Sequence, residues 1–233
     1  MKTASEHKEE NAPLKGRIEA HTNERNALLR ESLHSKGIMD ADLFIQKGVP
    51  QSLLFMVEII PVIHELYAHE PENIRKSVLD VGPQNLAGTA LLRDIHSAES
   101  YNRLKLDVQA LDITDKFQDF GKIIAPGVDL LVSDIFEIKE RTWDFIIASH
   151  VIEHVSEPAQ FVRRLQELAT DFVIIACPWR EFPLTTRDHL NSIDKEFTRK
   201  VGARGLKVFT NYSWGKRREV CIFWVPGLAK KVP

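Results

Sequence analysis

Three residues of the segment HVIEHV, residues 150–155, carry side chains that can bind a metal ion or move a proton. His150, Glu153 and His154 reproduce the H-x-x-E-H spacing of one metalloprotease class, in which the segment lies on a zinc-binding helix. The helix is needed because residues four apart then share one face. Zinc would also need a further protein ligand, and no other element of the sequence suggests one.

The residues on both sides of this segment argue against a helix. The preceding run WDFIIAS, 143–149, is short and rich in aromatic and β-branched residues, which is typical of a buried strand. Pro158 stands where a new helix would begin. We therefore expect residues 150–155 to form a loop or a single turn, and we expect no metal site there.

The elements that must position these residues alternate between strands and helices. From residue 77 onward, short β-branched runs are separated by helical segments; they are 78–82, 105–113, 129–135, 143–149 and 172–178. This alternation predicts a parallel sheet with right-handed crossovers. Only three residues separate the last two runs, 206–214 and 218–225, so these form an antiparallel hairpin. The fold class is thus α/β, a Rossmann-like sheet of mostly parallel strands with helices on both faces.

The N-terminal part of the chain has a helical period instead. Residues 1–12 are polar, and apolar residues then recur at helical spacing at Leu14, Ile18, Leu28, Leu29 and Leu33. A second helix, apolar enough to be largely buried, is expected from Pro50 to about Ala68. We divide the chain into a helical extension, 1–70, and a catalytic domain, 71–233. The extension could pack on that domain, cover its site as a lid or contact a second copy in a homodimer.

The overall composition excludes several classes of partner. Among 233 residues, 31 Lys and Arg stand against 33 Asp and Glu, which leaves no basic surface for nucleic acid. The N-terminus lacks the pattern of a secretory signal. The apolar stretch 53–63 contains Glu58 and Pro61 and is shorter than the ~20 residues of a membrane span. We expect a cytoplasmic protein without a membrane span, in which Cys177 and Cys221 are buried thiols.

Acidic residues end three consecutive predicted strands, at the edge where α/β sheets bind ligands. The first run, VLDVG, contains Asp80 and leads into a turn from Gly82 to Gly88 and then a helix expected over 89–98. Asp112 ends the second run and could accept hydrogen bonds from a ribose diol. Asp134 ends the third, beside Ile135 and Phe136, which would suit an adenine ring. Each could be a helix cap or turn residue, but three together favour a nucleoside site.

With these features the chain resembles the class I S-adenosylmethionine-dependent methyltransferases over roughly residues 70–227. The resemblance rests on VLDVG, Asp112, the pair Ser133-Asp134, the run WDFIIASHVIEHVSEP, ACPW at the fifth strand end, and the final hairpin. It implies the strand order 3-2-1-4-5-7-6 with strand 7 antiparallel. It also implies S-adenosylmethionine as the cofactor and S-adenosylhomocysteine as the product.

The resemblance further implies a set of cofactor-binding residues at the strand ends. These are Asp80, Gly82, Pro83, Gln84, Asp112, Ile113, Asp134, Ile135, Phe136, Ser149 and His150. The chain departs from the family at the G-x-G-x-G turn, where Gln84 stands in place of the second glycine and the loop is longer. The turn is either rebuilt to accept the methionine part of the cofactor or has lost that function.

Methyl transfer to an alcohol benefits from a general base, and histidine is a natural candidate. We expect this role of His150, His154 or His189, although His154 and Glu153 could equally serve the framework. The segment after the fifth strand, which contains His189, should overhang the acceptor. It carries aromatic and cationic side chains suited to sugars or anionic small molecules, namely Trp179, Arg180, Phe182 and Arg187. A hydroxyl of a sugar, a polysaccharide precursor or a natural product is the expected acceptor.

Two other classes of function remain open. A nicotinamide-dependent oxidoreductase is disfavoured by the absence of G-x-G-x-x-G and by the final hairpin. In addition, Asp112 follows Gly82 by 30 residues, rather than the ~20 of that fingerprint. A non-catalytic interaction module with a methyltransferase-like fold is suggested by the altered glycine turn and the helical extension.

Overall fold

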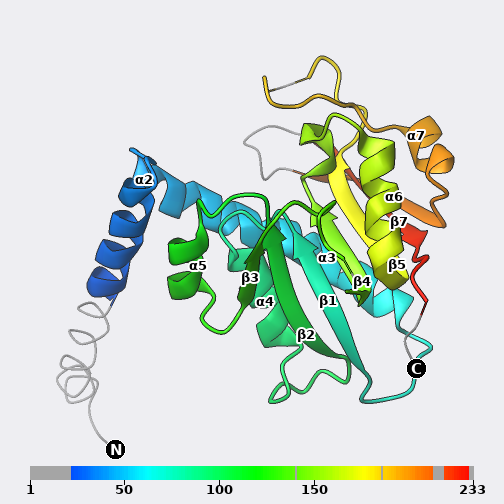
Figure 1. The fold of residues 1–233 in the computed structure, drawn as a ribbon, viewed down its shortest axis with the longest axis horizontal. Helices are drawn as coiled ribbons and strands as arrows, with labels where there is room; N and C mark the ends of the chain where they lie inside the picture. Colours follow the sequence, from blue (N-terminus) through cyan, green and yellow to red (C-terminus); the bar gives the residue numbers. More distant parts are fainter. Residues whose placement is uncertain (1–21, 140, 185, 212–217, 231–233) are drawn as a thin grey trace, which may run out of the picture.

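The computed structural model describes residues 22–139, 141–184, 186–211 and 218–230, which form a seven-stranded sheet with helices on both faces (Figure 1). The strands are β1 Arg75–Val81, β2 Lys105–Asp112, β3 Asp129–Val132, β4 Trp143–Ser149, β5 Ala169–Pro178, β6 Gly205–Asn211 and β7 Arg218–Pro226. Their order is β3-β2-β1-β4-β5-β7-β6. Strands β1 to β5 pair in parallel, and β7 is antiparallel to both β5 and β6. The predicted fold class and strand order are confirmed.

Helices cover the two faces of the sheet in two separate apolar clusters. The helical elements after residue 40 are α2 Ala41–Leu43, a π-helical turn Phe44–Gly48, α3 Val49–Leu66, α4 Ala87–Ile95, α5 Gln118–Ile124, a 3-10 turn Ile152–His154, α6 Pro158–Leu168 and α7 Lys195–Lys200. Residues of α3 and α4 pack on one face, against alternate side chains of β4 such as Phe145 and Ile147. Residues of α6 and α7 pack on the other, against Ile146 and Ala148. Alternation along β4 thus places one apolar set on each face.

The helix expected from Pro50 is longer at its start than the sequence indicated. Helical structure runs from Ala41 to Leu66, with the wider π turn immediately before Pro50, whose missing N–H prevents a regular α-helical bond. The helix is not largely buried: it buries one face, including Met56 and Ile59, and exposes Leu54. The continuous helical stretch Ala41–Leu66 is long and apolar enough to cross a membrane, by length and composition only, whereas the apolar run 53–63 of the sequence is too short. Within its most apolar window, 22% is buried inside the protein.

The first described helix, residues 22–35, packs on α5 at the β3 side of the sheet (Figure 1). Leu29 and Leu33 are buried there with Phe120 of α5. Leu28, from the same predicted stripe, is 48% exposed. Leu14 and Ile18 lie outside the described residues. Packing of this segment on the domain is therefore observed, whereas its service as a lid or a dimer contact stays a prediction.

Strands β5 and β7 bring the two cysteines side by side. Cys177 and Cys221 are directly paired across these strands, and both are fully buried with their Sγ atoms 3.5 Å apart. Burial raises the pKa of the Cys177 thiol well above its usual value. The prediction of buried thiols within the core is confirmed.

Candidate functional site

A cavity of about 400 Å³ opens at the carboxyl ends of β1 and β4. Its walls are the first turns of α3, the turn after β1, the turn after β4 and the loop after β5. Eight of the predicted site residues line it: Asp80, Gly82, Pro83, Gln84, Ser149, His150, His154 and His189. Residues that are distant in the sequence therefore meet in one hollow, of the size usual for small-molecule sites.

The turn after β1 keeps the backbone shape of a glycine-rich turn without all of its glycines. Gly82, Gln84 and Leu86 have φ angles of 68°, 53° and 61°, a left-handed conformation that favours glycine. At Gly82 a Cβ would lie only 2.5 Å from a methyl group of Val151, so the close approach of the β4 turn requires glycine here. Gln84, which stands where the family has its second glycine, thus has a left-handed backbone. That the turn accepts the methionine part of the cofactor stays a prediction.

Asn85 and Gly88 fix this turn to the start of α3. The Asn85 amide donates to the carbonyl oxygen of Gly48 at 2.9 Å, and its oxygen accepts from the N–H of Ala87 at 3.0 Å. The Gly88 N–H donates to Ser52 Oγ at 3.0 Å. A Cβ on Gly88 would lie 2.7 Å from the Ser52 carbonyl oxygen. The second glycine of the turn is therefore needed for contact between α4 and α3.

Gly88→Ala should lower the free energy of unfolding by about 2 kcal/mol, although alanine is the better helix former. The added methyl meets backbone rather than a flexible side chain, so the two helices must separate. Urea unfolding measures the change. Gln160→Ala on the exposed side of α6 is the control and should change stability by less than about 0.5 kcal/mol. Equal stability of Gly88→Ala and the wild type would contradict this account of the helix contact.

Asp80 is a buried carboxyl at the floor of the cavity. It is 3% exposed, and Oδ2 accepts one hydrogen bond, from Thr89 Oγ1 at 2.6 Å. Burial raises the pKa of the Asp80 carboxyl to about 7, against the opposing effect of the Thr89 hydrogen bond. Nearby Asp112 raises this pKa further. A carboxyl held in this way is suited to a cationic ligand, whose charge would offset the cost of burying the carboxylate.

Asp112 and Asp134 each hold a turn at their strand ends. Asp112 Oδ1 accepts from the N–H of Thr114, and Asp134 Oδ1 accepts from the N–H of Phe136, both at 3.0 Å. Burial raises the pKa of the Asp112 carboxyl. Neither aspartate borders the cavity described above. The neighbouring apolar residues also lie outside it: Ile113 and Phe136 are 69% and 51% exposed, whereas Ile135 is packed in the core.

His150 begins the turn after β4 in a strained backbone conformation. Its φ angle is 56°, which is uncommon outside glycine and asparagine. The imidazole stacks on Phe55 of α3, with ring centroids 3.8 Å apart, and its Nδ1 lies 3.3 Å from Glu153 Oε1. Phe55 was not predicted as a site residue, because in the sequence it is one apolar residue of a helix. Its position opposite His150 depends on how α3 crosses the sheet.

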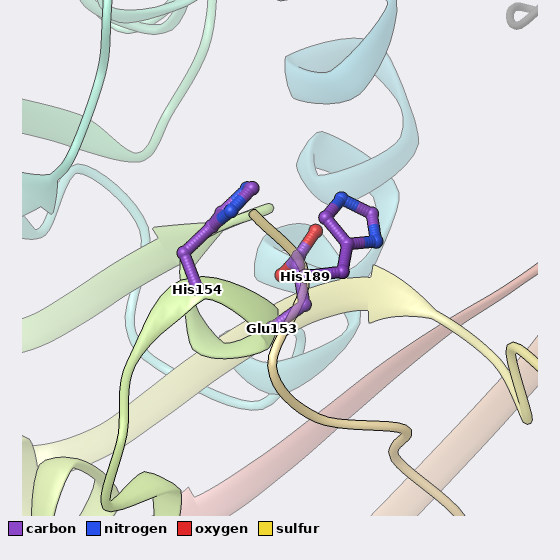
Figure 2. Close-up of side chains that lie close together, drawn as sticks. All are labelled: Glu153, His154 and His189. Carbon is purple, nitrogen blue, oxygen red and sulfur yellow. The ribbon is translucent and has the colours of Figure 1, made fainter. Parts of the chain in front are cut away.

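Glu153 and His154 lie on a single 3-10 turn, Ile152–His154, as the sequence analysis expected of this segment. The structure adds His189 from the loop after β5, and Figure 2 shows the three side chains converging. One potential ligand atom from each of the three lies within 4.8 Å of the others. His189 Nδ1 is hydrogen-bonded to the Glu181 carboxylate. The sequence did not indicate a further metal ligand to join Glu153 and His154, whereas the fold places His189 beside them.

The loop after β5 is held against this turn by its backbone. The N–H groups of Leu190 and Asn191 donate to the Glu153 carbonyl oxygen at 2.7 and 3.2 Å. Within the described part of this loop, Thr186, Asp188 and His189 border the cavity. The aromatic and cationic residues of this loop were expected to border the cavity as well, but they lie elsewhere. Trp179 is buried in the core, Phe182 is 92% exposed, and Arg180 and Arg187 lie outside the cavity lining.

No protein-family model matches the sequence, and no curated protein matches it either. Solved structures do match the fold. Magnesium protoporphyrin IX methyltransferase from Synechocystis, crystallised with S-adenosylhomocysteine, is 15% identical, with a TM-score of 0.55 over 78% of this chain and 87% of its own. DhpI in complex with S-adenosylhomocysteine is 18% identical, with a TM-score of 0.52 over 86% and 98%. A methyltransferase from Aquifex aeolicus is 20% identical, with a TM-score of 0.50 over 70% and 87%.

Proposed function

We propose that this chain, which has the fold of the class I S-adenosylmethionine-dependent methyltransferases, is itself such an enzyme. The observation that carries the proposal is the cavity at the carboxyl ends of β1 and β4. There a buried carboxyl, Asp80, and a left-handed turn at Gly82 face the polar residues Ser149 and His150. This is the switch region of an α/β sheet, where strand order reverses between β1 and β4 and where such folds bind ligands.

The side chains of the cavity fit the methionine part of S-adenosylmethionine. Asp80 supplies a negative charge for its ammonium group. Ser149 Oγ is buried and has no hydrogen-bond partner among the described residues, which suits a polar group of the ligand. Gly82 itself borders the cavity, and the absence of a Cβ there lets Val151 of the turn after β4 pack against it. Asp112, one strand further along the same edge, would accept hydrogen bonds from the ribose hydroxyls.

When bound, S-adenosylmethionine supplies an electrophilic methyl group, and its transfer to oxygen breaks the carbon–sulfur bond and leaves S-adenosylhomocysteine. The protein must align the acceptor hydroxyl and take up its proton. We assign proton acceptance to His150, because its ring borders the cavity and Glu153 Oε1 lies 3.3 Å from Nδ1. The carboxylate orients the imidazole and stabilises the imidazolium that forms, while Phe55 holds the ring plane by stacking.

A small hydroxylated acceptor, such as a sugar, a polysaccharide precursor or a natural product, fits the remaining cavity wall. Gln51, Ser52, Thr186 and Asp188 offer several hydrogen-bond donors and acceptors, and Phe55 offers an apolar ring face. Such a mixture suits a polyol better than an extended apolar substrate. The acceptor's own hydroxyls would replace the hydrogen bonds that these side chains otherwise make to water.

Isothermal titration of the purified 233-residue chain with S-adenosylhomocysteine tests the cofactor assignment. We expect one site per chain and no comparable heat from NAD. A second assay incubates the protein with methyl-labelled S-adenosylmethionine and a panel of monosaccharides and nucleotide sugars, and follows label in the acceptor. His150→Ala should reduce the turnover number by about 100- to 10,000-fold, the usual contribution of a general base, while S-adenosylhomocysteine still binds.

Each alternative function predicts a different outcome in these experiments. Binding of NAD without S-adenosylhomocysteine would overturn the proposal in favour of an oxidoreductase. Binding of neither would favour the non-catalytic interaction module suggested by the altered glycine turn. S-adenosylhomocysteine binding with unchanged turnover in His150→Ala would retain the enzyme class and overturn the role assigned to His150.

A further inference from the structure

Glu153 is a buried carboxylate whose hydrogen bonds are unfilled. The residue is 1% exposed, and neither carboxylate oxygen has a hydrogen-bond partner among the described residues. Nδ1 of His150 lies 3.3 Å from Oε1. A buried carboxylate costs several kcal/mol unless it is paired or binds a cation. Its surroundings therefore indicate which cation could satisfy the second oxygen.

Two histidines face this carboxylate from different elements. His154 belongs to the same 3-10 turn, and His189 reaches it from the loop after β5 (Figure 2). The two rings meet edge to face with centroids 4.8 Å apart. One ligand atom from each of Glu153, His154 and His189 lies within 4.8 Å of the others. Two imidazoles and one carboxylate are a recurring ligand set for divalent transition metals.

Each histidine is also held by a second partner on its other side. His189 Nδ1 is hydrogen-bonded to the carboxylate of Glu181, which is 8% exposed. His154 Nδ1 donates to the carbonyl oxygen of Asp188 at 3.1 Å. Both contacts fix Nδ1 as the protonated nitrogen and leave the Nε2 lone pair for a ligand. Metal-binding histidines almost always have such a partner, which sets the tautomer and the ring orientation.

The backbone holds the three groups together before any ion arrives. The N–H groups of Leu190 and Asn191 bond to the carbonyl oxygen of Glu153, which fixes the His189 loop against the turn. The Asn191 side-chain amide donates to the Val155 carbonyl oxygen on the far side of the same turn. All three candidate ligands border the cavity, so an ion could enter from solvent and would have coordination positions facing the acceptor.

We infer that Glu153, His154 and His189 bind one divalent transition-metal ion, with open coordination positions toward the cavity. The site would hold an acceptor oxygen next to His150 and make its hydroxyl more acidic. The proton would pass to His150 as the oxygen forms its bond to the methyl carbon and the sulfur keeps the electron pair of the broken bond. This role rests on the proposed methyltransferase function, whereas binding of the ion itself does not.

Cobalt(II) chloride, added alone to the chelator-treated 233-residue chain, is the probe. Its visible absorption reports coordination by nitrogen and oxygen, and calorimetry gives the affinity and the number of sites. We expect one site per chain. His189→Ala and Glu153→Gln should each weaken cobalt binding by more than the 10- to 100-fold typical of outer partners. Glu181→Gln changes the partner of His189 and also removes the charge that faces Arg218. It should weaken cobalt binding by about 10- to 100-fold.

His69→Ala, at an exposed histidine beyond the end of α3, is the matched control and should leave cobalt binding unchanged. Circular dichroism of each variant confirms that it is folded. The inference is overturned if the wild type binds no cobalt, or if folded His189→Ala and Glu153→Gln bind it as tightly as the wild type. A parallel titration with S-adenosylhomocysteine separates the two proposals. Cobalt binding without S-adenosylhomocysteine binding retains the metal site and overturns the methyltransferase, and the reverse result overturns only the metal site.

Discussion

Asp112→Ala should weaken S-adenosylhomocysteine binding by on the order of 100-fold, measured by calorimetry. The substitution removes the carboxylate that would accept hydrogen bonds from both ribose hydroxyls. Hydrogen bonds to a charged acceptor contribute roughly 1.5–3 kcal/mol each. Asp112 Oδ1 accepts a hydrogen bond from the N–H of Thr114, and the ribose hydroxyls would bond the remaining acceptor positions of the carboxylate.

Two further variants separate ligand contact from turn structure. Asp112→Asn keeps an oxygen for the Thr114 N–H and one acceptor for the ribose, so its loss should be smaller, about tenfold. Asp115→Ala, on the same loop, removes an exposed carboxylate that pairs with Lys36, and its affinity should equal that of the wild type. Wild-type affinity in Asp112→Ala would refute the assignment of Asp112 to the ribose.

Asp80→Asn should make the ligand-free protein more stable at high pH while weakening its binding of S-adenosylhomocysteine. The pKa of the Asp80 carboxyl is raised by burial from 3.8 to about 7. Between these values the folded chain holds a proton that the unfolded chain has lost. The contribution of Asp80 to the free energy of unfolding therefore falls as pH rises through this window and is constant above it. The full penalty is about 4 kcal/mol, and the uncharged amide does not incur it.

Chemical unfolding of both proteins between about pH 4 and about pH 8 measures this effect. Asp80→Asn should gain stability relative to the wild type as pH rises, and the gain should be complete slightly above pH 7. Thr89→Val is a second variant for this test, because it removes the Thr89 hydrogen bond that favours the ionised form of Asp80. A pH-independent difference between Asp80→Asn and the wild type would contradict the raised pKa.

The fold could be predicted from the sequence because its strands and helices differ in pattern. The run 143–149 is apolar on both faces of β4, as a central parallel strand requires. The boundaries were less accurate. The third run was expected to reach residue 135, but β3 ends at Val132, because Asp134 turns the chain by bonding the N–H of Phe136. A turn formed by a side chain is not visible in apolar periodicity.

The site could be predicted only where its residues lie at strand ends. Gly82 comes directly after β1, and Ser149 and His150 lie at the end of β4. The structure brings the three together in one cavity. The approach of His189 to Glu153 could not be predicted, since the two residues are 36 positions apart in the sequence and a whole helix and strand lie between them. The sequence spacing instead suggested His150 and His154 as a pair, and the single turn directs the two rings to different partners, Phe55 and His189.

The loop after β5 has a consequence for how this protein could change its acceptor. Its two ends are joined to each other: Trp179 and Ile193 form a β-bridge, and the Arg180 N–H donates to the Ile193 carbonyl oxygen at 2.9 Å. A loop closed at its base can be lengthened at a small entropic cost and without moving the sheet. Residues between the two ends could thus be replaced by loop grafting, which would test whether this loop sets the acceptor specificity of the proposed enzyme.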